Sequence, residues 1–366
     1  MKRFILVLLA VLLLASCGGG ATFSEGYETA RQNSNLNLNG MFYTDTYDGP
    51  DFMAQRLWFF DFDSMKSAIM CARPNCKHDD PEVCTSFGMN DYPTVVGNKL
   101  YFFSHDAEWD KDGKLHQYHY VWKAELDGSS RLKIDTIEGF ETIKDLVVKG
   151  SVAYFTTQER EHEDYTGVNT GYEKAYICSY DYANEKFTNY GLLADGYPAG
   201  ADILGEYNGG LYIRGYYGNE NDDDYHDWIR FYSRFDLETG EISEWDMPIS
   251  SLNQYGNTKP MLASGGFYGY MDGDNAVIVD SEGAEMVLEG YELSDLSTTT
   301  PINGYLFNVD DGTAIDLSNG EILEMNMKII PKYSYVLCYH DGSYIIYNQM
   351  GGSNFKKISE DDIFKD

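Results

Sequence analysis

The sequence is poor in basic residues and has no long apolar run beyond its N-terminal segment. Among its 366 residues, 27 are basic and 59 are acidic, which gives a formal net charge of −32. Such an acidic surface repels phosphate backbones and anionic lipid headgroups, so we expect no binding to nucleic acid. No run of 18 or more apolar residues follows the N-terminal segment. We therefore expect the remainder of the chain to be soluble.

The sequence also lacks the short motifs of common catalytic sites. It contains no G-x-S-x-G, no H-E-x-x-H and no glycine-rich phosphate-binding loop. Carboxylate pairs that could cleave a glycosidic bond cannot be singled out among 59 acidic residues without geometry. We predict a binding or scaffolding protein with no assigned catalytic residue. The alternatives are a carbohydrate-active lyase or hydrolase and a structural partner in an envelope complex.

The N-terminus has the features of an export signal. Lys2 and Arg3 precede the apolar stretch 4–14, which is too short to span a bilayer. The following Leu-Ala-Ser-Cys17 resembles the lipobox of bacterial lipoproteins, in which the cysteine becomes the lipidated first residue. An ordinary signal peptide or an uncleaved anchor is the alternative. Lipidation of Cys17 would place the protein outside the cytoplasm, anchored to the bacterial cell membrane.

These features divide the chain into three parts. Residues 1–16 are the predicted signal peptide, residues 17–35 a lipidated cysteine with a glycine-rich tether, and residues 36–366 a single folded domain. Loss of the signal leaves 25 basic and 59 acidic residues, a net charge of −34. We expect the mature protein to be a monomer.

An internal repeat indicates the fold of the predicted domain. Aromatic residues make up 15% of the chain and glycine occurs 36 times, which favours many short strands joined by tight turns. A short element resembling N-G-x-L-Y recurs at spacings of 58, 53, 58, 56, 39 and 38 residues. Its seven copies reach the same position at Tyr43, Tyr101, Tyr154, Tyr212, Tyr268, Phe307 and Ile345.

A second element follows most copies and completes a four-stranded unit. It consists of an alternating strand, an acidic residue and a turn, as in CSYDYANEK and SRFDLETGE. In the third copy the expected strands are DLVV, SVAYFTT, KAYICSYDY and KFTNYG. Seven such antiparallel meanders predict an all-β fold, a seven-bladed β-propeller. Eight blades or a pair of β-sandwiches are the alternatives.

The seventh copy is shorter than the others. It contains YSYVLCY, SYIIYN and NFKKIS, and no fourth strand follows before the acidic C-terminus. Closure of the ring would then need a strand from the segment between Ala21 and Leu38. We state this as a hypothesis about how the propeller closes.

The repeated elements behind a lipobox resemble those of a family of bacterial surface lipoproteins with poorly characterised propeller domains. Members of that family also carry a C-x4-C-x-H…C segment after the first blade, matched here by Cys71, Cys76, His78 and Cys84. The resemblance covers nearly the whole mature chain and implies a propeller. It implies no activity, because function does not follow from fold.

Three consecutive repeats carry long acidic insertions between their second and third strands. The insertions are residues 104–119, 157–171 and 216–228, and the meander places them as loops on one face of the ring. Aromatic rings beside carboxylates suit a glycan, a peptide or a protein ligand. The candidate ligand-binding residues are His105, Trp109, His116, His119, His162, Tyr165, Tyr225, His226 and Trp228. Solvated acidic loops without a ligand are the alternative.

The first insertion also imitates the start of a calcium loop, with Glu108, Asp110 and Asp112 before Gly113. His119 stands where the bidentate glutamate of such a loop is required, so a plain turn is preferred to a calcium site.

The segment CARPNCKHDDPEVC contains the remaining candidate site. Cys71, Cys76, His78 and Cys84 have the composition of a structural zinc site, whereas export from the cytoplasm equally suits a disulfide among the cysteines. Free thiols are the third alternative. By the meander argument the segment should emerge beside the first acidic insertion. Four protein ligands would leave no position for a substrate, so we expect it to hold the loop rather than to catalyse.

Overall fold

The computed structural model describes most of the chain after residue 35. The described residues are 36–37, 40–48, 53–89, 91–111, 115–162, 169–219, 229–245, 261–264, 267–272, 275–280, 282–289, 301–331, 334–348 and 354–365. The predicted signal, Cys17 and the tether lie outside them. Among the described residues, no helix has the length and apolar character needed to cross a bilayer.

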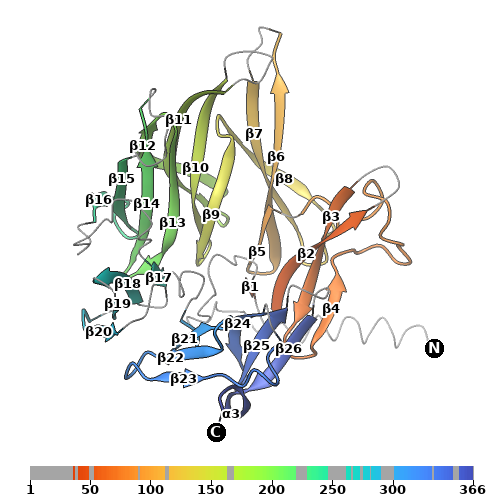
Figure 1. Cartoon of the computed structure of the whole chain (residues 1–366). Helices are drawn as coiled ribbons and strands as arrows, with labels where there is room; N and C mark the ends of the chain where they lie inside the picture. Colours follow the sequence, from red (N-terminus) through yellow and green to blue (C-terminus); the bar gives the residue numbers. More distant parts are fainter. Residues whose placement is uncertain are drawn as a thin grey trace, which may run out of the picture.

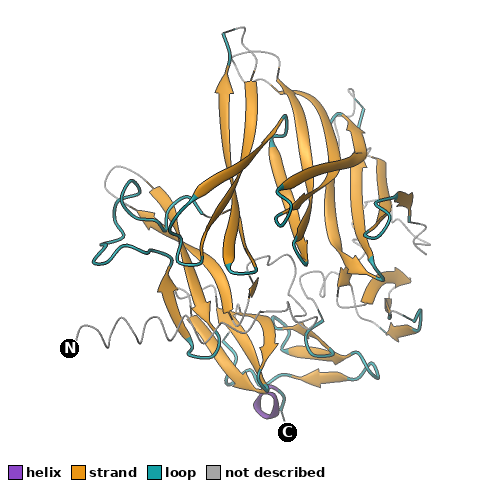
Figure 2. Ribbon diagram, turned by 180° about the vertical axis from the view of Figure 1, so that it is seen from behind, coloured by secondary structure: helices purple, strands orange, loops and turns teal. Residues whose placement is uncertain are grey.

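In the described part of the chain, antiparallel strands form seven small sheets, and a short helix, α3 (Glu360–Ile363), follows the last strand (Figure 2). The first sheet contains β1 (Leu36–Asn37), β2 (Gly40–Asp48), β3 (Met53–Asp61) and β4 (Lys66–Ile69); the second contains β5 (Asp91–Val96), β6 (Lys99–Trp109), β7 (Leu115–Glu125) and β8 (Leu132–Glu138); and the third contains β9 (Thr142–Lys149), β10 (Val152–His162), β11 (Asn169–Asp181) and β12 (Lys186–Gly196). The fourth sheet contains β13 (Ala199–Tyr207), β14 (Gly210–Tyr217), β15 (Ile229–Asp236) and β16 (Ile242–Glu244), and the fifth contains β17 (Met261–Ser264), β18 (Phe267–Asp272), β19 (Asn275–Val279) and β20 (Glu285–Leu288). The sixth sheet contains β21 (Tyr305–Asn308), β22 (Thr313–Asp316) and β23 (Ile322–Glu324), and the seventh contains β24 (Ser334–His340), β25 (Ser343–Asn348) and β26 (Asn354–Ser359).

The seven sheets follow one another around a ring, from the first sheet to the seventh, which lies beside the first (Figure 1). Each sheet is a meander of consecutive strands, as the repeats predict. The prediction of an all-β, seven-bladed propeller is therefore confirmed. The four strands expected in the third copy are β9 to β12.

The repeated acidic residue of the second element has a structural role in this meander. It stands at or just past the end of the strand that precedes the last turn of its unit, where the chain turns back. In five units its Oδ1 accepts a hydrogen bond from the backbone N–H two residues on, at 2.8 to 3.0 Å, which closes an Asx turn. These residues are Asp127, Asp181, Asp236, Asp280 and Asp316. Part of the acidity of the chain thus shapes turns.

The core consists of apolar clusters between neighbouring sheets. Buried side chains of each sheet pack against those of the next, in six clusters that link the first sheet to the seventh. A further cluster joins the seventh sheet back to the first and closes the ring. At this junction the rings of Phe60 and Phe355 stack with centroids 3.7 Å apart. His340 Nε2 lies 2.8 Å from Asp63 Oδ1 beside them.

The C-terminus adds a second contact between blades. After α3, Phe364 forms an antiparallel bridge with Met325, which follows β23 of the sixth sheet. Asn326 N–H donates to the Ile363 carbonyl at 2.8 Å, and the Ile363 side chain is buried in the cluster between the sixth and seventh sheets. The end of the chain therefore ties these two sheets together.

The sixth and seventh sheets have three strands each among the described residues. For the seventh sheet this agrees with its shortened repeat. The described end of the proposed N-terminal closing strand, Leu36–Asn37, pairs with β2 in the first sheet. Residues 21–35 lie outside the described part, so their share in closing the ring stays a hypothesis.

Removal of the aromatic contact at the closure should loosen the ring. We expect Phe60→Ala to lower the free energy of unfolding by about 3–5 kcal/mol, because it leaves a cavity where the first sheet meets the seventh. Leu192→Ala is the control, since the Leu192 side chain on β12 is 47% exposed. Chemical denaturation measures both changes. Equal losses in the two variants would contradict closure through this cluster.

Candidate functional site

The first two acidic insertions are strands over most of their length, which corrects the expectation of loops. The insertion 104–119 forms the outer part of the β6–β7 hairpin, and residues 157–162 and 169–171 extend β10 and β11. Cross-strand pairing continues to Trp109 and Leu115 at the end of the first hairpin. A sequence that alternates polar and aromatic residues is compatible with either a strand or a loop. Pairing across the hairpin makes these segments strands.

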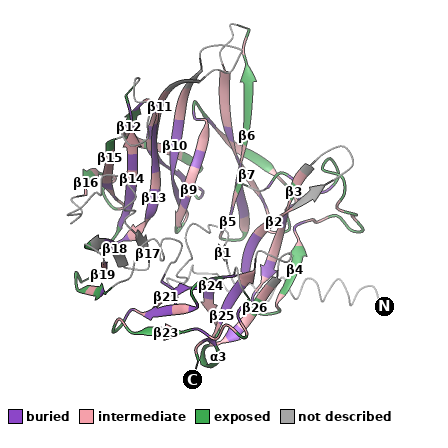
Figure 3. Ribbon diagram, viewed as in Figure 1, coloured by how far each residue is buried: buried purple, intermediate pink, exposed green. Residues whose placement is uncertain are grey.

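The end of the β6–β7 hairpin projects beyond the packed part of its sheet (Figure 3). The residues of β6 from Leu100 to Phe103 are buried, whereas those from His105 to Trp109 are all exposed. Both faces of β6 are therefore open to solvent over this end. The hairpin offers a rigid, exposed surface on a fixed scaffold, the usual setting of a binding site.

One face of the projecting hairpin carries a row of aromatic rings. His116, Tyr118 and Tyr120 occupy alternate positions of β7, so their side chains point to the same face. Centroids of neighbouring rings are 6.4 and 6.3 Å apart, with interplanar angles of 16° and 7°. The three nearly parallel rings form what we call the aromatic ladder. Lys133 Nζ on β8 lies 4.1 Å from the Tyr120 ring centroid.

Carboxylates flank the aromatic ladder. Asp106 and Glu108 on β6 pair directly with Tyr118 and His116, and so share their face. Asp110 Oδ2 lies 2.9 Å from His116 Nε2, which fixes the first ring of the ladder. Burial, and then the nearby carboxylates, raise the pKa of Tyr118. The ladder therefore lies in a negative field that disfavours any further negative charge beside it.

The opposite face of the hairpin holds the other two histidines. His105 and His119 pair directly across the strands, with ring centroids 4.9 Å apart. His119 is only 5% exposed, and its Nε2 lies 3.1 Å from the Phe140 carbonyl oxygen. Burial, and then the neighbouring His105, lower the pKa of His119 to about 4. Burial raises the pKa of the nearby Asp91, and His105 offsets only part of this rise.

This arrangement corrects one assignment. His119, a candidate ligand-binding residue, is a neutral core histidine at neutral pH. His105 is exposed, but its Nε2 lies 2.9 Å from Gln117 Oε1 on the face away from the ladder. Of the three hairpin histidines, only His116 belongs to the row of rings. Sequence spacing grouped the three because it does not show which face of a strand a side chain occupies.

The remaining candidates divide between the described and the undescribed parts. Trp109 is 39% exposed at the end of β6, on the face of His105. The backbone of His162 ends β10. Tyr165, Tyr225, His226 and Trp228 lie outside the described residues. Tyr118 and Tyr120 were not among the candidates predicted from the sequence, although the alternation H-x-Y-x-Y at residues 116–120 is a signal for one face of a strand.

The base of the second hairpin is held by charges that are already paired. Arg160 on β10 lies 2.7 Å from Glu173 and 2.9 Å from Glu141. Glu173 is nearly buried and accepts hydrogen bonds from Gln158 Nε2 and from the Ala199 backbone N–H of the fourth sheet. This network joins the third sheet to the fourth, and we assign it a structural role.

The cysteine segment forms a second candidate site, a candidate metal centre. Cys71, Cys76, His78 and Cys84 each offer a ligand atom, and these atoms all lie within 4.8 Å of one another. His78 Nδ1 is 3.3 Å from Cys84 Sγ. The described cysteines, 71, 76, 84, 178 and 338, are all free thiols. Cys178 and Cys338 are buried in strands, as expected of small apolar side chains.

The two outer cysteines of this group differ in acidity. Burial acts to raise the pKa of Cys71, but hydrogen bonds from Thr85 and from backbone N–H groups lower it to about 6. Burial raises the pKa of Cys84 to about 11.

The segment follows β4 and leads to β5, so it links the first two blades as the repeat predicts. Its position along the axis differs from the expectation. A Cβ on Gly128, in the β7–β8 turn, would lie 3.0 Å from the Met70 carbonyl oxygen and 3.4 Å from that of Thr85. That turn is at the opposite end of the 11-residue strand β7 from the projecting hairpin, about 33 Å away along the strand. The two candidate sites are therefore separate.

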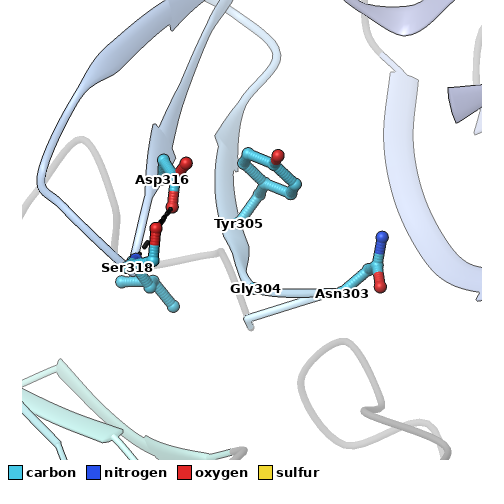
Figure 4. A pocket seen from close by; sticks show the side chains of 6 residues that line it. Asn303, Gly304, Tyr305, Asp316 and Ser318 are labelled. Carbon is cyan, nitrogen blue, oxygen red and sulfur yellow. Dashed lines mark hydrogen bonds between the residues drawn. The ribbon is translucent and has the colours of Figure 1, made fainter. Parts of the chain in front are cut away.

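A shallow depression lies on the sixth sheet (Figure 4). Asn303, Gly304, Tyr305, Asp316, Leu317 and Ser318 line it. The Ser318 hydroxyl donates to Asp316 Oδ1 at 2.6 Å, and Asn303 Nδ2 lies 3.2 Å from the Tyr344 hydroxyl. These polar groups already have hydrogen-bond partners within the protein, so we assign the depression no ligand.

The chain resembles known proteins in fold alone. No family model matches the chain, and no curated protein matches it. Among solved structures it is similar to an acylaminoacyl peptidase of Pyrococcus horikoshii, with 12% identity over 94% of this chain and 52% of that one, at a TM-score of 0.45. The chain thus spans about half the length of that peptidase.

Two further structures match over most of both chains. The β-propeller domain of the Trilobed protease from Pyrococcus furiosus has 13% identity over 94% of this chain and 100% of the other, at a TM-score of 0.41. An oligogalacturonate lyase in complex with manganese has 8% identity over 92% and 90%, at a TM-score of 0.43. At such identities the likeness concerns architecture alone.

The depressed pKa of His119 should make stability depend on pH. In the unfolded chain this side chain takes up a proton near pH 6.5, whereas in the folded protein it stays neutral down to about pH 4. The unfolded state therefore binds more protons across this window, and stability falls as the pH falls. The difference corresponds to about 3 kcal/mol.

The His119→Gln variant tests this expectation, since glutamine keeps a donor for the Phe140 carbonyl but does not titrate. We expect the stability of wild type relative to this variant to fall by about 3 kcal/mol between pH 7 and pH 4. Urea denaturation across that range measures it, with Leu192→Ala, which removes an exposed side chain and no titratable group, as the control. A pH-independent difference would show that His119 takes up its proton normally in the folded state.

Proposed function

We propose that the protein is a binding protein whose ligand, a glycan or a peptide, lies against the aromatic ladder of the β6–β7 hairpin. The observation that carries this proposal is the row of His116, Tyr118 and Tyr120, flanked by carboxylates on a projecting, exposed hairpin. Apolar surface rimmed by polar residues commonly marks an interaction site.

The chemistry of the hairpin limits the ligand. Flat rings stack against sugar rings or peptide side chains, and carboxylates accept hydrogen bonds from hydroxyl or amine groups. The net charge of −32 repels anionic ligands. The ligand therefore carries hydroxyl groups or positive charge, and no phosphate or sulfate.

The proposal includes a location outside the cytoplasm. The basic start, the apolar stretch and the lipobox support a lipid anchor at Cys17, with the propeller held at the bacterial cell surface by the tether. A hairpin that projects from an anchored propeller would be accessible to surface glycans or extracellular peptides.

Substitution of the ladder should weaken binding without unfolding the protein. We expect Tyr118→Ala to weaken the binding of a ligand found by glycan or peptide array at least tenfold, or about 1.4 kcal/mol. The loss follows from removal of the central ring and its stacking area. Titration calorimetry with the purified ligand measures the change. Asp106→Asn should also weaken binding, because it removes an acceptor beside Tyr118.

Tyr335→Ala serves as the matched control, since Tyr335 on β24 is 43% exposed in the seventh sheet, away from the hairpin. It should bind as wild type does. Unchanged binding by Tyr118→Ala would remove the ladder from the site. Release of shortened sugars from a bound glycan would favour the enzyme alternative.

A further inference from the structure

Within the cysteine segment, the side chains that turn inward are almost all metal-ligand types. Between residues 73 and 83 every position is exposed except Cys76 and His78. Cys71 is half-buried at the start of the segment and Cys84 is buried at its end. The segment has no regular secondary structure, and its one branched aliphatic side chain, Val83, is 42% exposed. A loop of this kind needs another source of order, and bound metal supplies it in many small folds.

We propose that Cys71, Cys76, His78 and Cys84 bind one zinc ion, which clamps the link between the first and second blades. Three sulfurs and one imidazole nitrogen form the Cys₃His set of closed structural zinc sites. With zinc–sulfur distances of about 2.3 Å, tetrahedral geometry places sulfurs about 3.8 Å apart and nitrogen and sulfur about 3.5 Å apart. The 3.3 Å between His78 Nδ1 and Cys84 Sγ, and the 4.8 Å limit for all four atoms, fit with small shifts.

Surrounding groups support the ligands. The Ser86 backbone N–H lies 3.5 Å from Cys84 Sγ and the Ser86 hydroxyl 2.9 Å from it. Arg56 Nη1 donates to the His78 carbonyl at 3.1 Å, and the Arg56 guanidinium also pairs with Asp45 on β2. His78 has a positive φ of 59°, a left-handed conformation that contacts of this kind help to hold. Such second contacts orient ligands at metal sites.

The charge of the filled site has a counterpart nearby. A +2 ion bound by three thiolates leaves a net charge of −1 at the site. Arg131 lies close enough to Cys84 and Cys71 to interact with them electrostatically. Its Nη1 donates to the Phe87 carbonyl at 2.9 Å, while its Nη2 is buried with no hydrogen-bond partner in the described part of the chain. A buried guanidinium is stabilised by the anionic cluster.

A disulfide accounts for less of this arrangement. A bond between two of the three sulfurs would leave the third cysteine and His78 turned inward without a function. It would also leave Arg131 beside an uncharged cluster. Zinc uses all four inward side chains and requires no oxidant.

The clamp has a structural consequence at the start of the ring. The Leu57 backbone N–H donates to the Ser86 carbonyl at 2.9 Å, so the residues after Cys84 return to pair with β3. Gly128 of the second sheet packs against the carbonyls of Met70 and Thr85. Zinc at the four ligands would therefore hold the two ends of the segment where the first sheet meets the second.

Elemental analysis of the purified, reduced protein tests the proposal directly, and we expect one zinc ion per chain. Cobalt(II) in place of zinc should give the charge-transfer absorption of thiolate ligands and the visible bands of a tetrahedral site. Removal of the ion with a chelator should lower the melting temperature by about 5 °C or more. Failure of the reduced protein to take up zinc or cobalt would overturn the proposal.

Variants separate ligation from a merely structural effect. His78→Ala should lose the ion, whereas His78→Cys should retain it with altered cobalt absorption, because four ligands remain. Cys338→Ala is the matched control, since this buried thiol lies in the seventh sheet, and it should keep one zinc ion. Titration of thiols in the unfolded, unreduced protein should find the same number as after reduction. Two fewer thiols before reduction would establish the disulfide instead.

Discussion

The structure depends on the packing of apolar side chains between neighbouring sheets, repeated around a closed ring. A single sheet of three or four short strands cannot bury enough apolar surface to be stable alone, so each blade needs a neighbour on both sides. The first sheet packs against the second on one side and against the seventh on the other. The contact with the seventh sheet is the cluster that contains Phe60 and Phe355. Closure of the ring therefore stabilises every other contact.

Packing between neighbouring sheets also determines which strand surfaces remain accessible to a ligand. Strand segments inside the ring have both faces committed to packing, as in Leu100 to Phe103 of β6. Only strand ends that extend beyond the ring keep a free face, and the β6–β7 hairpin is such an extension. Its aromatic ladder is rigid because it continues a strand of the scaffold. A ligand would meet rings already in place, with little loss of side-chain entropy on binding.

The cysteine segment lies at the other end of the second sheet, where the chain passes from the first blade to the second. The link between the first two blades is long, and its middle is exposed, so apolar packing cannot order it. Cys84 and Met89 anchor its return in the core, and the zinc ion proposed at the four ligands would order the rest. The proposed ligand-binding ladder and the proposed zinc site thus lie at opposite ends of β7, so the two proposals can be tested independently.

The sequence by itself determined the repeat, the seven blades and the residue types of both sites, because strand alternation, turn residues and ligand composition are local properties. It determined even the short seventh blade. Only the tertiary structure decided that the insertions are paired strands, that His119 is buried while His116 is not, and that the cysteine segment lies far from the hairpin. These depend on cross-strand register, on the twist of each blade and on contacts between distant residues such as Met70 and Gly128. A linear pattern does not specify such contacts.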